Sequence, residues 1–209
     1  MLFRSVGRIV QGWEIKNGHY VLTSSGETIG LVDFFRPQQM RYISQGRVTP
    51  KGLRPDAFFI TRTRGSKTET ARAEFDWDHG KILYGHARDT KIGALAEGTQ
   101  DLMSLAYHFS LSPPPPGRVQ IPVTTGKDLD MQEIEILPEE VIDTPMGQLR
   151  ALPLRQIARP GKSHFALWLA VRYNYLPVRI HHFDREGNRA GEQVAIEIRV
   201  GDERELAQR

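Results

Sequence analysis

The feature that most constrains this chain is an alternation of apolar and polar side chains with a period of two, the period of a β-strand. Residues 71–77 and 194–200 show it most clearly, with apolar side chains at every second position. Short turn-forming sequences such as Asn17-Gly18 separate the alternating stretches, which predicts consecutive antiparallel hairpins. Further strand-like stretches lie at about 9–15, 19–30, 38–49, 57–64, 81–86, 118–125, 131–137, 147–157 and 176–184.

One strand differs from the others. The segment Phe165–Ala170 is apolar at every position, so both of its faces are expected to be covered. Such a strand lies either between two layers or in the middle of a closed or strongly curved sheet.

One helix interrupts the strands, at 99–110. Thr99 is its expected N-cap, and Asp101 complements the partial positive charge of the first turn. Four prolines at 113–116 end the helix, because proline cannot continue it, and form a stiff connector over 112–117. Apolar residues recur at helical spacing at Leu102, Leu105, Ala106 and Phe109.

This pattern predicts a mainly β protein with a single domain over 1–209. We expect one antiparallel sheet interrupted by the amphipathic helix, which either covers the core of the sheet or, if the sheet is strongly curved, lies over an apolar cavity as a lid. The expected organisation is a strand set at 1–98, the helix, the proline-rich connector, a second strand set at 118–200 and a flexible tail at 201–209.

Composition excludes several classes of protein. The 209 residues are 39% hydrophobic and 25% charged, as in an ordinary globular protein, and no apolar run is long enough to span a bilayer as a helix. The absence of cysteine excludes disulfides, thiolate metal sites and cysteine nucleophiles. A net charge of only +3 gives little support to nucleic-acid binding.

The N-terminal sequence gives little information on location. Residues 1–8 lack the apolar stretch of a secretory signal, which by itself predicts the cytoplasm. A truncated N-terminus would give the same sequence.

The chemical motifs are weak. The seven histidines show no metal-ligand spacing, and His181 and His182 point to opposite faces of a strand. Asp76 and Asp78 share a strand face and are followed by His79, so they are candidates for a hydrolytic pair, although a polar strand face ending in a turn explains them more simply.

A basic stripe is the second weak motif. Arg62, Arg64, Lys67 and Arg72 lie near two phenylalanines, an arrangement that single-stranded nucleic acid would fit. The acidic residues that follow at 69–78 cancel much of its field, so a solvated hairpin face is the simpler interpretation.

Seven short segments, distributed over nearly the whole chain, are informative when taken together. They are Gly46–Pro50, Gly52–Pro55, Glu74–Asp78, Gln100–Leu105, Asp143–Gly147, Leu167–Ala170 and Leu176–Ile180. Together they resemble a proteobacterial family of unknown function, domain-of-unknown-function family 3108. The resemblance implies an envelope protein, since family members typically carry an N-terminal export or anchoring segment, and it implies no catalytic residue. It also implies a fold similar to that of the periplasmic lipoprotein carriers, so we expect one antiparallel, strongly curved sheet of about ten strands that forms a half-barrel, with the helix at 99–110 against its concave face as a lid.

We therefore expect a periplasmic, non-enzymatic protein without cofactor or metal, which binds or carries a lipid, a lipoprotein acyl chain or another hydrophobic or amphipathic molecule. The alternative is a structural or assembly module that binds an envelope protein, and a hydrolase using Asp76 and Asp78 is a remote third. The ligand-lining residues predicted from side-chain type are Leu102, Leu105, Tyr107 and Phe109 from the helix, and Phe75, Trp77, Leu167, Trp168 and Leu169 from strands.

Overall fold

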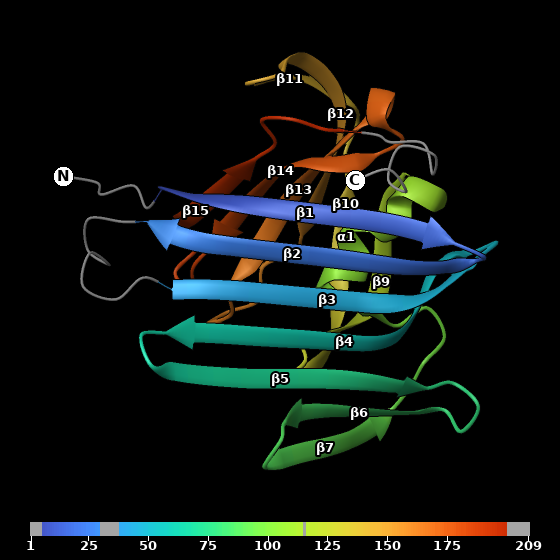
Figure 1. The fold of residues 1–209 in the computed structure, drawn as a ribbon. Coiled ribbons are helices and arrows are strands. Elements are labelled where there is room, and N and C mark those ends of the chain that lie inside the picture. Colours follow the sequence, from blue (N-terminus) through green and yellow to red (C-terminus); the bar gives the residue numbers. More distant parts are fainter. Residues whose placement is uncertain (1–5, 30–37, 115, 200–209) are drawn as a thin grey trace.

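The computed structural model describes residues 6–29, 38–114 and 116–199, and this part of the chain is mainly β-structure (Figure 1). Its fifteen strands form two sheets of seven and eight strands. The prediction of about ten strands in one antiparallel sheet is therefore wrong. The chain changes sheet just before the helix: the strands up to residue 94 form one sheet, and those from residue 100 onward form the other. The predicted tail at 201–209 lies outside the described residues.

Sheet A is an antiparallel meander in which every strand pairs with its neighbours in the sequence. Asn17 and Gly18 both have positive φ, 52° and 75°, as the tight turn between the first two strands requires. The strands are β1 (Val6–Lys16), β2 (His19–Ile29), β3 (Gln38–Thr49), β4 (Gly52–Arg64), β5 (Lys67–Asp76), β6 (Lys81–His86) and β7 (Asp89–Ala94).

Sheet B curls into a half-barrel, with the order β15-β14-β13-β12-β10-β9-β8 and with β11 paired to β12. It is a mixed sheet, because the short β8 runs parallel to β9. The apolar strand β13 lies in the middle, between β12 and β14, as its sequence predicts. The strands are β8 (Gln100–Asp101), β9 (Gly117–Thr124), β10 (Leu129–Ile136), β11 (Glu140–Thr144), β12 (Gly147–Gln156), β13 (His164–Ala170), β14 (Leu176–Phe183) and β15 (Arg189–Val194).

The predicted strand at 194–200 is not formed over 195–199. β15 has β14 as its neighbour, and their register ends where Arg179 pairs with Val194. Just beyond this register, the Ala195 amide donates a backbone hydrogen bond to the Val178 carbonyl at 2.8 Å. The alternating apolar residues of 195–199 therefore lie beyond the sheet ladder.

The helix α1 (Leu102–Leu111) begins later than the sequence predicts. Asp101, not Thr99, is its N-cap, and one carboxylate oxygen accepts hydrogen bonds from the amides of Met103 and Ser104, both at 2.8 Å. The Thr99 hydroxyl instead donates to the Ala96 carbonyl, within the turn that precedes β8.

The helix lies between the two sheets rather than over one of them (Figure 1). Met103 and Tyr107 pack into the core of sheet A, whereas Leu105 and Phe109 pack into the core of sheet B. Both pairs have the i, i+4 spacing that places side chains on one side of a helix. The predicted single apolar stripe is wrong for this reason, and its first member, Leu102, is 38% exposed.

A buried polar chain joins the start of α1 to sheet A. Ser44 of β3 donates to the Asp101 carboxylate at 2.6 Å, and the Tyr20 hydroxyl of β2 lies 3.1 Å from Ser44 Oγ. Burial raises the pKa of Asp101 to about 6, although the hydrogen bonds from Ser44, Ser104 and Met103 oppose the change.

Candidate ligand-binding cleft

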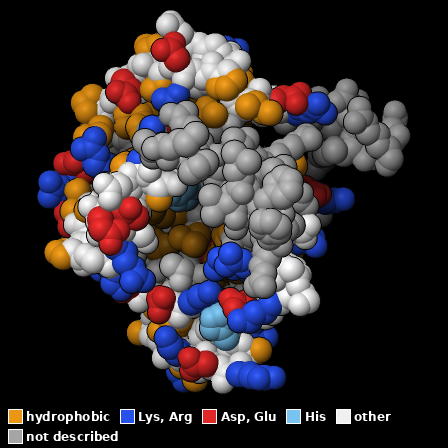
Figure 2. Space-filling view, turned by 90° about the vertical axis from the view of Figure 1, so that its left-hand side faces the viewer, with side chains coloured by type: hydrophobic (Ala, Val, Ile, Leu, Met, Phe, Trp, Pro, Cys, Tyr) orange, Lys and Arg blue, Asp and Glu red, His pale blue; other side chains and the backbone are white. Residues whose placement is uncertain are grey.

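The two sheets leave a cleft open along one seam of the molecule. One wall is β1, an edge strand of sheet A, and the other is formed by β14 and β15 of sheet B with residues 195–199, which follow β15. The C-terminal end of α1 also lines the cleft. The cleft has a volume of about 1160 Å³. Figure 2 shows a hollow in one side of the molecule, with hydrophobic side chains at its base.

The β1 wall is built by the period of two. Ile9, Trp13 and Ile15 line the cleft, on the face of sheet A that also carries the buried Tyr20 and Leu22 of β2. Because β1 has a neighbour on one side only, Ile9 and Ile15 remain 42% and 40% exposed.

The helix is attached to this wall by an aromatic contact and a hydrogen bond. The rings of Trp13 and Tyr107 meet edge to face with centroids 5.2 Å apart, and the Tyr107 hydroxyl donates to Gln11 Oε1 at 2.7 Å. Burial raises the pKa of Tyr107, so its hydroxyl stays protonated as a donor at neutral pH.

The opposite wall is formed by β14 and by the chain around and after the end of β15. Apolar side chains predominate there, and Val178 itself is buried. The apolar residues of this wall are Leu176, Pro177, Val178, Ile180, Val194, Ala195, Ile196 and Ile198.

The connection between β13 and β14 closes one end of this wall. A short 3-10 turn, Val171–Tyr173, is followed by Asn174 and Tyr175 with φ of 50° and 57°. The left-handed conformation is common for asparagine but costly for a bulky tyrosine. Two hydrogen bonds hold it in place: Tyr175 N donates to Ala170 O at 2.9 Å, and Ser110 Oγ of α1 donates to Tyr175 O at 3.1 Å.

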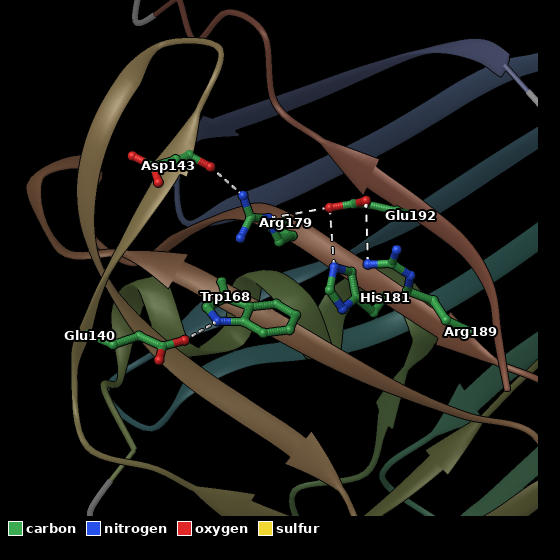
Figure 3. A network of polar contacts seen from close by, with 7 residues as sticks. All are labelled: Glu140, Asp143, Trp168, Arg179, His181, Arg189 and Glu192. Carbon is green, nitrogen blue, oxygen red and sulfur yellow. Dashed lines mark hydrogen bonds and ion pairs between the residues drawn. The ribbon is translucent and has the colours of Figure 1, made fainter. Parts of the chain in front are cut away.

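A polar network reinforces the outer side of the β14–β15 wall (Figure 3). Glu192 accepts a hydrogen bond from His181 at 3.1 Å and forms ion pairs with Arg179 at 3.5 Å and Arg189 at 3.8 Å. Burial raises the pKa of Glu192, but these three partners together hold it below its ordinary value. Glu192 is therefore an anion that joins β15 to β14.

The same network reaches β11. Arg179 also donates to the backbone carbonyl of Asp143, and the Trp168 indole N–H donates to Glu140 at 2.7 Å. The arginine side chain is thus held between two strands, with its nitrogen Nε buried and outside hydrogen-bond geometry. This arrangement fixes the position of Arg179 where it lines the cleft.

The structure disperses the nine predicted ligand-lining residues. Tyr107 lines the cleft, and Leu102 lines a second pocket of about 190 Å³ on sheet A. Trp168 lies on the outer face of β13, whereas Leu167 and Leu169, which flank it in the chain, point to the other face. The others belong to two cores: Phe75 and Trp77 to that of sheet A, and Leu105, Phe109, Leu167 and Leu169 to that of sheet B.

Sequence reasoning missed most of the cleft. Ile9, Trp13 and Ile15 were expected to lie in a strand, but nothing in their pattern says that the strand is at the edge of a sheet. The segments 172–180 and 193–199 meet β1 only through the tertiary fold. The one local signal was the apolar alternation at 194–200, which continues past the end of β15.

The Asp76–His79 motif forms a turn. His79 donates its backbone amide to Asp76 at 3.1 Å, and its ring nitrogen Nδ1 lies 2.8 Å from the same carboxylate. The hydrogen bond between the two side chains lowers the pKa of Asp76 and raises that of His79. Both side chains are exposed, and neither they nor Asp78 line the cleft.

The other polar motifs are surface features. Lys67 and Arg72 of the basic stripe form ion pairs with Glu69 at 3.0 Å and Glu74 at 3.1 Å, which agrees with a solvated hairpin face. Within the described residues, no three His, Asp or Glu side chains are grouped so that they would hold a metal ion.

The fold and cleft together define a β-half-barrel protein with a helix enclosed between two sheets. The chain belongs to the family described as "Protein of unknown function (DUF3108)", which matches residues 2–193, so the resemblance inferred from the sequence is confirmed. A search of curated proteins finds no match.

A solved structure shares the fold. It is the crystal structure of the "Beta-barrel-like Protein of Domain of Unknown Function DUF1849" from Brucella abortus, with a TM-score of 0.58 and 12% sequence identity. The similarity covers 90% of this chain and 88% of that one. At this identity the likeness concerns the fold alone. No helix within the described residues is long and apolar enough to cross a membrane.

Proposed function

We propose that the protein is a non-enzymatic component of the bacterial envelope that binds or carries a hydrophobic or amphipathic molecule, such as a lipid acyl chain, in the cleft between its sheets. The observation that carries the proposal is the apolar cleft itself. Its volume of about 1160 Å³ is slightly above the range that small-molecule sites occupy, roughly 300–1,000 Å³, so it has room for a long acyl chain. The periplasmic location proposed here rests on the family resemblance.

The way the cleft is built supports a binding role. Two hydrophobic cores are packed around α1, and a third contains Val178, which also lines the cleft. The fold therefore keeps a cleft of about 1160 Å³ directly beside packed interiors. Its two strand walls belong to different sheets and share no ladder of hydrogen bonds. The walls can therefore separate around a ligand without the loss of strand pairing within either sheet.

The first test is native mass spectrometry of the purified protein, followed by organic extraction of anything that it releases. We expect a stoichiometric adduct in the lipid mass range, or the uptake of lipid when the protein is incubated with an envelope lipid extract. A clean mass that does not change after this incubation would contradict the proposal.

A matched pair of variants places the ligand in the cleft. Ile9 and Val10 are adjacent in β1 and similarly exposed, at 42% and 55%, but only Ile9 lines the cleft. We expect Ile9→Glu to abolish acyl-chain binding, because it introduces a charge into the apolar wall, and Val10→Glu to retain it. Equal binding by both variants would exclude the β1 wall as part of the site.

The free edge of β1 favours a second function, that of an assembly module. β1 is eleven residues long, is paired on one side only, and carries the exposed Ile9, Val10 and Ile15. An edge strand of this kind is suited to pairing with an extended segment of another protein. This function predicts a protein partner that both Ile9→Glu and Val10→Glu weaken, in a preparation that binds no lipid.

A further inference from the structure

The charges along the cleft are unequal in number. Three arginines, Arg172, Arg179 and Arg199, line it together with one carboxylate, Glu197. Arg199 is paired with Glu197: its Nε and Nη2 donate hydrogen bonds to the two carboxylate oxygens at 2.7 and 3.1 Å. Arg179 already has partners, because it forms an ion pair with Glu192 and donates to the Asp143 carbonyl.

Arg172 is the remaining cation. Its guanidinium carbon lies 5.1 Å from the centre of the Tyr173 ring, and within the described chain it has no carboxylate partner. The side chain is exposed, so it is accessible from the cleft. Because the ring of Tyr173 also lines the cleft, a cation rests on an aromatic platform beside an apolar wall.

The backbone holds this arginine in position. The two hydrogen bonds of Tyr175, to Ala170 and from Ser110, fix the left-handed turn that directly follows the 3-10 turn carrying Arg172. One of them comes from α1, which also lines the cleft. Arg172 is thus presented next to the apolar wall by bonds from both the sheet and the helix.

We infer that the ligand of the cleft is a long-chain carboxylate, with its hydrocarbon chain along the apolar walls and its head group bound by the Arg172 guanidinium. This inference rests on the proposed function. The planar fork of a guanidinium donates two parallel hydrogen bonds to the two oxygens of a carboxylate. Among the described residues of the cleft, the Arg172 charge alone has no carboxylate partner, and one such cation balances the single charge of a carboxylate. A phosphate monoester, with a charge of about −1.5 to −2 at neutral pH, would remain partly uncompensated.

The test compares three probes of equal chain length: hexadecanoate, hexadecanol and hexadecyl phosphate. Their dissociation constants are measured by native mass spectrometry for the wild type, Arg172→Gln, Arg172→Lys and Arg159→Gln. Arg159 lies in the loop between β12 and β13, outside the cleft lining, and serves as the charge-matched control.

We expect hexadecanoate to bind most tightly to the wild type and to lose about tenfold in affinity in Arg172→Gln, the size of one charge-assisted hydrogen-bonded contact. Hexadecanol binding stays unchanged in that variant. Arg172→Lys retains part of the hexadecanoate affinity because the charge remains but the fork is lost. Arg159→Gln binds every probe as the wild type does.

Several outcomes would overturn the inference. Equal weakening of hexadecanoate and hexadecanol in Arg172→Gln would mean that the side chain acts through packing. Tightest binding of hexadecyl phosphate would exclude the carboxylate assignment. If Arg172→Gln binds hexadecanoate as the wild type does while Ile9→Glu does not, the head-group inference fails and the proposed function stands. If the wild type binds none of the probes and no lipid from the extract, both fail.

Discussion

At the residue scale, Asp101 combines two tasks that conflict at neutral pH. It caps α1 by accepting two backbone amides, and it lies at the centre of a fully buried site beside Ser44 and Tyr20. Its capping oxygen accepts best when the carboxyl group is ionised, yet burial penalises the ionised form. The balance of these effects places its pKa at about 6, above the ordinary value of 3.8.

This pKa predicts how Asp101 affects stability as the pH changes. Between pH 3.8 and about 6 the unfolded chain releases the Asp101 proton while the folded chain keeps it, so the contribution to stability falls as the pH rises. Its full size is about 3 kcal/mol, and it is constant above pH 6. Asp101→Asn keeps a side-chain oxygen for the cap and removes the titration.

We therefore expect the free energy of unfolding of the wild type, relative to Asp101→Asn, to decrease by a few kcal/mol from pH 4 to pH 6.5. Urea denaturation of both proteins over this range measures it. Surface carboxylates such as Asp76, whose pKa is lowered, make stability rise with pH, but they do so equally in both proteins. Taking the difference between wild type and Asp101→Asn therefore removes their contribution. A difference that does not vary with pH would show that Asp101 titrates normally in the fold.

At the element scale, α1 shows where sequence patterns stop being informative. The helix was predicted at nearly the right place, because Pro113–Pro116 must end it and helical spacing is visible before them. Its buried faces were predicted incorrectly, because a single apolar stripe assumes a single covering sheet. Met103 and Tyr107 are buried by sheet A, a second layer that no local pattern reveals.

The strands show the same limit. The period of two predicts which residues alternate along a strand, and the break in it at β13 indicates a strand that is covered on both sides or lies in the middle of a curved sheet, of which the structure shows the second. It does not say which strands pair, so the division between β7 and β8 into two sheets was missed. The cleft was missed with it, since its walls are edges, and an edge strand has the same alternation as a central one.

The position of α1 between two sheets can be tested with a pair of leucines three residues apart. Leu105 is 2% exposed within the sheet B core, whereas Leu102 is 38% exposed. We expect Leu105→Ala to lower the free energy of unfolding by about 2–5 kcal/mol and Leu102→Ala by less than about 1 kcal/mol. Urea denaturation measures both. Similar losses of unfolding free energy in the two variants would mean that Leu102 is buried like Leu105, as the single apolar stripe predicted from the sequence requires.

At the scale of the whole molecule, the two seams between the sheets differ. On one side the β9–β10 turn meets sheet A directly, with Gly85 N donating to Gly126 O at 2.8 Å and Lys91 lying 3.7 Å from Asp128. On the other side β1 and β14–β15 face each other across the cleft. The contacts that cross this second seam run through α1, from Tyr107 to Gln11 and from Ser110 to Tyr175.

This asymmetry makes α1 the element through which both cleft walls are connected. A ligand in the cleft adds contacts between the two walls, so it stabilises the open seam more than the closed one. Local opening free energies differ between regions of one protein, and edge strands with few buried contacts lie at the low end. Ligand binding should therefore protect backbone amides from hydrogen exchange more strongly at the cleft walls than in the central strands.

We therefore expect hydrogen exchange to be fastest at β1 and at residues 193–199 in the ligand-free protein, and to slow there by about tenfold or more when hexadecanoate is bound at saturation. The central strands β4 and β5 should exchange at the same rate in both states, because their ladder is already closed on both sides. Peptide-level exchange with mass spectrometry resolves these segments. Uniform slowing of exchange across both sheets would instead mean that the ligand stabilises the whole molecule. Slowing confined to β4 and β5 would place the ligand on sheet A, at the small pocket beside Leu102.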